Sequence, residues 1–125
     1  MVIVDTSVWV AYLRPGSHNI DAKMEQLVDA EQAAPTGITE LELRRGLRPH
    51  EAERVGTLLR SQPYVAFERE DFVEAGALLQ QLQKRGITLG VPDTLLAALC
   101  LRTKLPLFTL DGDFGNISNL RVLEN

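Results

Sequence analysis

Hydrophobic residues follow two different spacings along this chain, and the two spacings alternate. Short unbroken runs of hydrophobic residues, such as Val2 to Val4, are typical of buried strands. Longer segments repeat their hydrophobic residues every three or four positions, as Ile20, Met24 and Leu27 do, and this spacing predicts helices. The pattern predicts strands at 2–5, 33–35, 64–67, 106–110 and 120–123, and helices at 7–13, 18–32, 36–47, 50–61, 70–85 and 92–103.

Strands that alternate with helices form parallel sheets, because each helix carries the chain back to the start of the next strand. We therefore expect an α/β fold of three layers, in which a central, mostly parallel sheet of four to five strands has helices on both faces. The 125 residues are enough for one hydrophobic core, so we expect a single domain over residues 1–125. No apolar stretch approaches the length of a membrane span, and the first residues lack the pattern of a signal peptide.

The charges of the chain differ from those of an ordinary nucleic-acid binder. Acidic residues number 17 and basic residues 13, which gives a net charge of -4, whereas nucleic-acid binders are usually basic. Either the protein binds no nucleic acid, or metal ions supply the positive charge where phosphate docks. Several arginines nevertheless gather in one region, either as a solvated helix face or as a binding surface. They are Arg44, Arg45, Arg48, Arg54 and Arg60.

The single cysteine, Cys100, lies in an apolar segment between Leu95 and Leu101. This position predicts a small, buried and unreactive side chain. One cysteine cannot form a disulfide within the chain, which fits the reducing environment of the cytoplasm. We therefore expect a cytoplasmic protein.

Two aspartates stand at the ends of predicted strands. Asp5 follows the first run of hydrophobic residues, and Asp111 follows the run at 106–110. Ligands of open parallel sheets bind beyond the carboxyl ends of the strands, so both acids lie where chemistry is usually done. Each acid also has a structural explanation, because Asp5 can cap the next helix and Asp111 precedes Gly112 in a turn. Asp113 is an alternative to Asp111.

Two further acids are predicted to face the body of the protein from helices. At about 100° per residue, Glu42 falls within the apolar arc of its helix, whereas Glu40 falls on the polar side beside Arg44. A carboxylate that faces the core is costly unless it is paired or bound to metal, so Glu42 is either a metal ligand or the partner of Arg45. Asp93 lies in a first helical turn above a buried face. Its negative charge either interacts favourably with the helix dipole alone or also joins the other acids in a site. The apolar arc consists of Ile38, Leu41, Leu43, Gly46 and Leu47.

Four carboxylates around one edge of a sheet indicate a metal site. Ligands that are all oxygen suit Mg²⁺ or Mn²⁺. Zinc is disfavoured, because His18 and His50 are isolated and no pair of cysteines or histidines has a zinc-binding spacing. Carboxylates that hold one or two such ions are the usual apparatus for the attack of water on a phosphodiester.

Four segments, in order, resemble the motifs of the PIN-domain nucleases, and most closely those of the VapC-type toxins of bacterial and archaeal toxin–antitoxin pairs. The segments are Val4-Asp5-Thr6-Ser7, residues 38–46, residues 92–98 and residues 109–114. In the second motif of the family the catalytic glutamate stands four residues before a glycine, which selects Glu42 over Glu40. The resemblance covers nearly the whole chain and implies a PIN-like fold.

The resemblance also implies a function. Such a protein is an endoribonuclease that depends on Mg²⁺ or Mn²⁺, is commonly a homodimer and is inhibited by a small antitoxin partner. The resemblance implies that Asp5, Glu42 and Asp93 hold the metal. Asp111 would be a fourth ligand or a water-mediated support, with Asp113 as the alternative. Nearby hydroxyl groups either orient these carboxylates or make ordinary capping bonds, and they belong to Thr6, Ser7 and Thr109.

The first predicted helix offers a surface for a partner. Residues 7–13 are too few to bury all of their large side chains, and Trp9 and Tyr12 are residue types that anchor interfaces. In the resembling toxins an antitoxin segment lies in a groove near this helix and can reach an arginine or lysine towards the acids. The alternative for these side chains is ordinary core packing.

Other functions fit the residues less well. Phosphotransfer of the response-regulator type needs a lysine after a late strand, and Lys104 stands before the strand at 106–110. Phosphatases of the haloacid-dehalogenase type need a second aspartate two residues after the first, where this chain has Ser7. A third alternative is a catalytically silent PIN-like module that binds RNA or protein.

Overall fold

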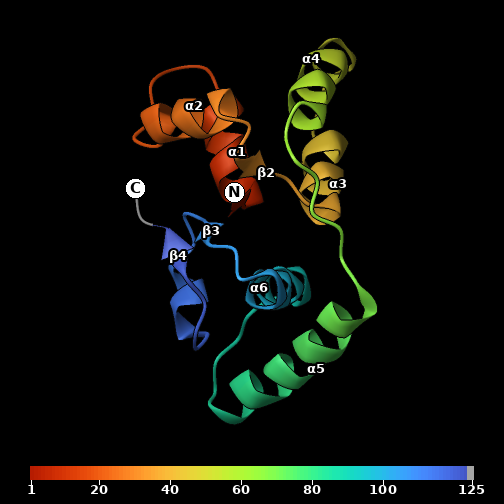
Figure 1. Ribbon diagram of the computed structural model, residues 1–125, viewed down its shortest axis with the longest axis vertical. Coiled ribbons are helices and arrows are strands. Elements are labelled where there is room, and N and C mark those ends of the chain that lie inside the picture. Colours follow the sequence, from red (N-terminus) through yellow and green to blue (C-terminus); the bar gives the residue numbers. More distant parts are fainter. Residues whose placement is uncertain (124–125) are drawn as a thin grey trace.

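A parallel sheet of four strands forms the centre of the computed structural model, which describes residues 1–123. The strands are β1 (Val2–Val4), β2 (Ala33–Ala34), β3 (Leu107–Phe108) and β4 (Val122–Leu123). They lie side by side in the order β2-β1-β3-β4, and every neighbouring pair is parallel. The predicted α/β architecture with a mostly parallel sheet of four to five strands is confirmed (Figure 1).

Helices fill most of the chain between the strands. Over the described residues they are α1 (Thr6–Leu13), α2 (Asp21–Asp29), α3 (Gly37–Arg45), α4 (Pro49–Arg60), α5 (Arg69–Lys84), α6 (Val91–Thr103) and the 3-10 helix η1 (Gly112–Asn116). Figure 1 shows α3 and α4 following one another on one side of the molecule, with α5 and α6 together at another. None of these helices combines the length and the apolar character needed to cross a bilayer.

The sheet separates two hydrophobic cores, because side chains alternate along each strand. Val2 and Val4 of β1, with Phe108 of β3, pack against residues of α1, α2, α3 and α4. Ile3 and Leu107 face the other way and pack against α5, α6 and η1. Helices therefore cover both faces of the sheet, as predicted.

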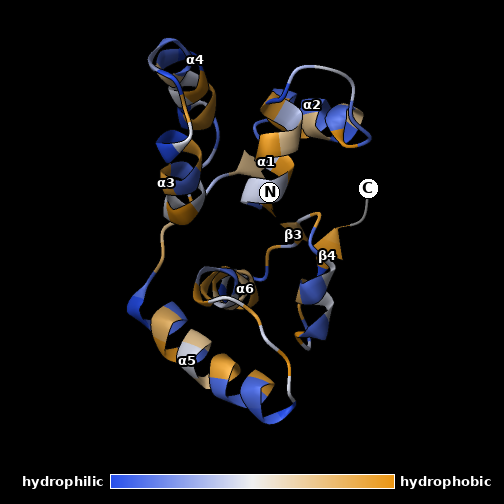
Figure 2. Ribbon diagram, turned by 180° about the vertical axis from the view of Figure 1, so that it is seen from behind, coloured by the Kyte–Doolittle hydropathy of each residue, from blue (hydrophilic) through white to orange (hydrophobic). Residues whose placement is uncertain are grey.

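Helix α6 is buried on nearly all sides. Its residues from Thr94 to Cys100 are all buried, and they belong to the core below the sheet and to a smaller core shared with α5. Figure 2 shows hydrophobic residues around most of this helix, as expected for a helix enclosed by protein. The first turn of α6, which carries Asp93, is thereby held in a fixed place.

The strand predicted at residues 64–67 is wrong. The segment does alternate as a strand would, since Val65 and Phe67 are partly buried whereas Tyr64 and Ala66 are exposed. It pairs with no strand among the described residues, and the carbonyl of Ala66 instead accepts a hydrogen bond from Nη2 of Arg102, 3.2 Å away. Alternation reports burial on one side, and here helices rather than a sheet provide that burial.

Local chemistry sets several helix ends as the sequence predicted. Thr36 caps α3, and its side chain accepts a hydrogen bond from the backbone N–H of Thr39. Gly86 follows α5 with a φ of 71°, a conformation that favours glycine over other residues. The helix predicted over 18–32 is shorter in the structure, where α2 begins at Asp21 and ends at Asp29.

Candidate active site

Asp5 is the most firmly held of the predicted site residues. It follows β1, caps α1 and is 8% exposed. Its Oδ1 accepts a hydrogen bond from the backbone N–H of Thr6 at 2.8 Å. Its Oδ2 accepts from the hydroxyls of Ser7 at 2.9 Å and Thr109 at 2.8 Å. One oxygen of Asp5 therefore caps α1, while the hydroxyls of Ser7 and Thr109 hold the other oxygen in place. The sequence had left capping and orientation as alternatives.

Glu42 faces the first turn of α1, whereas Glu40 does not. The hydroxyl of Thr6 donates a hydrogen bond of 2.9 Å to Oε1 of Glu42. Glu40 instead lies 3.6 Å from Nε of Arg44, on another side of α3. Among the described residues no ion pair joins Glu42 to Arg45, so the structural alternative to a metal role does not apply.

The apolar arc predicted for α3 is buried only in part. Leu43 is buried as expected, but Leu41 is 66% exposed and Gly46 is also exposed. The helix packs against α1 along a narrow stripe that includes the buried Thr39. Thr39 was not among the predicted site residues, although its hydroxyl lies 3.5 Å from that of Thr6. Its place one turn before Leu43 is the signal that could have identified it.

Asp93 lies in the first turn of α6 among other acids. Burial, which is the largest cause, and the negative charges of Asp5, Asp111 and Glu42, in that order, together raise the pKa of its carboxyl to about 6. Asp113 has the same effect but comes last. The structure therefore brings the four predicted acids into one electrostatic cluster.

Asp111 ends the segment after β3 and caps η1. Its Oδ1 accepts a hydrogen bond from the backbone N–H of Asp113 at 2.9 Å. Its own backbone N–H donates to the hydroxyl of Thr109 at 3.0 Å, and that hydroxyl donates to Asp5. Asp113 is exposed and acts on Asp93 more weakly than Asp111 does. Asp111 is thus tied to the cluster through Thr109, and Asp113 lies at its margin.

The donor set of the cluster fits a hard divalent cation. Within residues 1–123 no three His, Cys, Asp or Glu side chains are already close enough together to form a ready-made metal site. Acids that face one another without a cation repel and stay apart. Mg²⁺ keeps several of its water ligands and binds proteins through one or two carboxylates, so it does not require three converged side chains.

A groove of about 380 Å³ lies between α1 and α3. It is partly apolar, and Glu42 lies on its wall. Trp9, predicted as a possible interface anchor, is completely buried in the core instead, and Tyr12 packs against it with the ring centres 6.4 Å apart. The groove is lined by Val10, Leu13, Arg14, Pro15, Glu42, Leu43, Gly46, Leu47 and Glu51.

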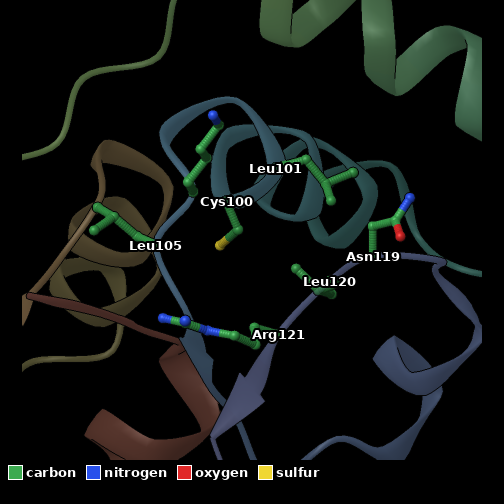
Figure 3. A pocket seen from close by; sticks show the side chains of 7 residues that line it. Cys100, Leu101, Leu105, Asn119, Leu120 and Arg121 are labelled. Carbon is green, nitrogen blue, oxygen red and sulfur yellow. The ribbon is translucent and has the colours of Figure 1, made fainter.

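A separate pocket of about 330 Å³ lies at the opposite ends of the strands (Figure 3). Its residues precede β3 and β4, so the acids do not line it. Cys100 forms part of its wall, and burial raises the pKa of this thiol to about 12. The predicted unreactive character of Cys100 agrees with this environment.

Known proteins share this architecture. Residues 2–120 match the family model of the PIN domain. A chain of the VapBC2 complex of Rickettsia felis with promoter DNA is 20% identical, with 98% of each chain covered and a TM-score of 0.83. A chain of FitAcB from Neisseria gonorrhoeae is 22% identical, with 99% of this chain and 97% of that one covered and a TM-score of 0.80. A chain of VapBC-1 from nontypeable Haemophilus influenzae is 20% identical, with 99% and 98% covered and a TM-score of 0.81. No match was found among curated protein sequences.

Proposed function

Because this chain belongs to the PIN-domain family, we propose that it is a Mg²⁺- or Mn²⁺-dependent endoribonuclease and the toxin of a toxin–antitoxin pair. The observation that carries the proposal is the cluster of acids around Asp93, where burial and then the charges of Asp5, Asp111 and Glu42 raise the pKa of Asp93 to about 6. Carboxylates that repel one another in this way need a cation or protons to balance them. We assign the activity to one PIN-like domain, residues 1–125.

Each acid has a place in this proposal. Asp5, Glu42 and Asp93 hold the ion, and Asp111 is a fourth ligand or supports the ion through water. Asp113 is the alternative to Asp111. A divalent ion held there supplies the positive charge that stabilises a phosphodiester under attack by water.

The chain itself orients the oxygens of the site. Asp5 accepts three hydrogen bonds, which prevent its carboxylate from rotating. Thr6 holds Glu42 through its hydroxyl, so the first turn of α1 positions two acids at once. We propose that Thr6, Ser7 and Thr109 are positioning residues, which hold the ligands without contacting the substrate.

The cleavage of RNA by the purified protein tests the enzyme. We expect cleavage that requires Mn²⁺ or Mg²⁺, stops with EDTA and returns when the ion is restored in excess. Glu42→Gln should abolish cleavage without loss of folding, and Glu40→Gln is its matched control on the same helix. Equal loss of activity in both variants would contradict the assignment of Glu42.

We propose that the groove between α1 and α3 receives the antitoxin. The solved complexes that this fold resembles are named as toxin–antitoxin or VapBC assemblies, which supports a protein partner here. Val10 is 39% exposed at the groove, and Leu13 and Leu47 line it, so an apolar segment has a surface to bury. Glu42 also lines the groove, and an arginine or lysine of the partner would meet the acids there in place of metal.

Growth of cells that produce the protein tests the toxin role. The chain alone should slow growth, and co-production of the small protein encoded next to it should relieve the effect. Asp5→Asn should be harmless without any partner. If Asp5→Asn is as toxic as the native chain, the harm arises from binding or misfolding and the proposal fails.

The proposed place of action is the cytoplasm. The free Cys100 and an RNA substrate both favour it.

The proposed oligomer is a homodimer. The exposed side chains of Leu41, Phe72 and Val91 favour it, and sedimentation at the mass of a monomer at all concentrations would contradict it. A catalytically silent module is the alternative function, which would keep the fold without metal-dependent cleavage. Cleavage that depends on metal excludes that module.

A further inference from the structure

Two arginines of the region between positions 44 and 60 come together at one point of the surface. A β-carbon on Gly56 of α4 would lie 3.2 Å from Nη1 of Arg60. The same point lies 3.4 Å from Nη2 and 3.5 Å from Nη1 of Arg44, which belongs to α3. Because Gly56 has no such atom, the guanidinium groups of Arg44 and Arg60 share the space above it.

Among the described residues, Glu40 is the one carboxylate that forms an ion pair with either arginine. Nε of Arg44 lies 3.6 Å from Oε2 of Glu40, which is too long for a hydrogen bond. In the described part of the chain, no carboxylate forms an ion pair with Arg60. The side chain of Arg44 is 40% exposed and Arg60 is exposed, so an anion from solution reaches both.

We propose that Arg44 and Arg60 together bind one phosphate group of an RNA strand. Each guanidinium presents a planar fork of N–H donors, and the two free oxygens of a phosphodiester can accept from both forks. An anion between two like charges also removes their repulsion. The inference rests on the proposed nuclease function, for which it identifies a surface that holds the backbone of the substrate.

Helix α3 carries both Glu42 of the acid cluster and Arg44 of this pair, on different sides. Glu42 and Arg44 are two residues apart, so they project about 200° apart around the helix. A strand that lies at the acids reaches the pair by crossing one helix, a width of about 10–12 Å. Arg45 lies on this path, because it projects about 60° around the helix from Glu42, towards Arg44. Its side chain is exposed.

The pair also accounts for RNA binding by an acidic protein. Charges that are exposed to solvent act over about 8–10 Å at physiological salt, so the local charge matters more than the net charge of -4. An acidic protein segment is the other ligand that two arginines attract. The position of Arg44 on the helix that carries Glu42 favours RNA, and the experiment below separates the two.

The binding of a fluorescently labelled single-stranded RNA, measured by anisotropy in EDTA so that no cleavage occurs, tests the pair. Arg44→Gln and Arg60→Gln should each weaken binding about tenfold. Each should also lower the slope of log affinity against log salt by about 0.7, which corresponds to one phosphate contact on a single strand. Since both arginines hold the same phosphate, the double variant should lose no more slope than either single variant.

Arg54→Gln is the matched control. It removes the same charge from the same helix, but residue 54 lies about 200° from Gly56 around α4. Its affinity for RNA should stay close to that of the native chain.

Gly56→Ala tests the shared space directly. The added methyl group lies between the two guanidinium groups and should weaken RNA binding severalfold. The melting temperature should rise at the same time, because alanine is more favourable than glycine inside a helix. Weaker binding by a more stable protein separates the proposed contact from an effect on folding.

Several results would overturn the inference. They are an equal loss in Arg54→Gln, no loss in Arg44→Gln and Arg60→Gln, unchanged affinity in Gly56→Ala, and no RNA binding by the native chain. Loss of antitoxin binding with intact RNA binding would overturn it too, because the pair would then belong to a protein interface. Binding that depends on both arginines, without any metal-dependent cleavage, would contradict the proposed function and leave the phosphate site standing.

Discussion

Asp71 in α5 and Asp93 in α6 both lie in the first turn of a helix, but their surroundings are opposite. The side chain of Asp71 is fully buried. It accepts hydrogen bonds from Nε of Arg102 at 2.6 Å and from Nη2 of Arg102 at 3.0 Å. It also accepts a hydrogen bond from the backbone N–H of Glu68 at 2.8 Å. Burial raises the pKa of Asp71, but the hydrogen bonds from Arg102 and Glu68 outweigh it and leave that pKa below its usual value.

Within residues 1–123, Asp93 has no such partners. Burial comes first among the causes that raise its pKa to about 6, and the charges of Asp5, Asp111 and Glu42 act in the same direction. The protein thus balances the negative charge of Asp71 with its own Arg102, whereas the groups that act on Asp93 are other acids. An acid whose charge the protein does not balance indicates a ligand from outside, and here that ligand is the proposed metal ion.

The largest expected effect that separates these two acids is on catalysis. Asp93→Asn should lower the rate of RNA cleavage by about 10³-fold, or ~4 kcal/mol of transition-state stabilisation, because it removes a proposed metal ligand. The melting temperature of the metal-free variant should stay the same or rise, because one repelling charge is gone. Cleavage assays and thermal melts of the two proteins measure both effects. A variant that melts well below the native chain would place Asp93 in the same class as Asp71.

Removal of Arg102 should act on stability. Arg102→Ala leaves the carboxylate of Asp71 buried without its cation and should lower the free energy of unfolding by about 2–3 kcal/mol. The loss is below that of a fully enclosed pair, because the side chain of Arg102 is 30% exposed. Urea denaturation measures it, with Arg69→Ala, an exposed arginine of the same first turn as Asp71, as the control. The same loss in the control would show that the ion pair is not its cause.

Divalent ions should stabilise the acid cluster and leave the Asp71–Arg102 pair unaffected. A ligand at 100 times its dissociation constant adds about 2.7 kcal/mol to the stability of the folded state. Millimolar Mg²⁺ or Mn²⁺ should therefore raise the melting temperature of the native chain and of Arg102→Ala, and raise it less in Asp5→Asn or Asp93→Asn. Equal increases in all four proteins would rule out a site shared by these acids.

The smallest expected effect is on the pH dependence of the metal-free protein. The pKa of Asp93 is about 6 in the folded state, above the ordinary value of 3.8, so the folded state holds the extra proton between these values. The stability contributed by Asp93 should then fall as pH rises through this window, and the loss is complete above pH 6. Asp71 acts in the opposite direction, since its lowered pKa stabilises the fold above pH 3.8 and this contribution is lost on further acidification. Urea midpoints between pH 5 and 7 should fall in the native chain and stay flat in Asp93→Asn.

The sequence predicted the positions of the proposed site acids better than the burial of the surfaces around them. Asp5 and Asp111 were identified from the strands that they follow, and Glu42 was separated from Glu40 by rotation around one helix. Each of these inferences depends on residues within about one turn. The hydrogen bond from Thr6 to Glu42 and the ion pair between Arg44 and Glu40 agree with them.

Errors arose where burial depends on a distant segment. Leu41 was expected to be buried and is 66% exposed, because α3 packs along a narrow stripe only. Trp9 was expected as a possible interface anchor and is fully buried, because α1 lies against the core formed with α2 and α4. Residues 64–67 have the alternation of a strand, but none of the described strands pairs with them.

The sequence by itself determined where each helix and strand carries its acids, because backbone hydrogen bonds and side-chain direction repeat within a few residues. Tertiary structure alone decided which charges meet. Arg102 reaches Asp71 across 31 positions of the chain, and Arg44 reaches Arg60 across a glycine of another helix. Contacts of this kind follow from the packing of whole surfaces, for which no local spacing exists, and they distinguish an acid that is already neutralised from one that still needs a cation.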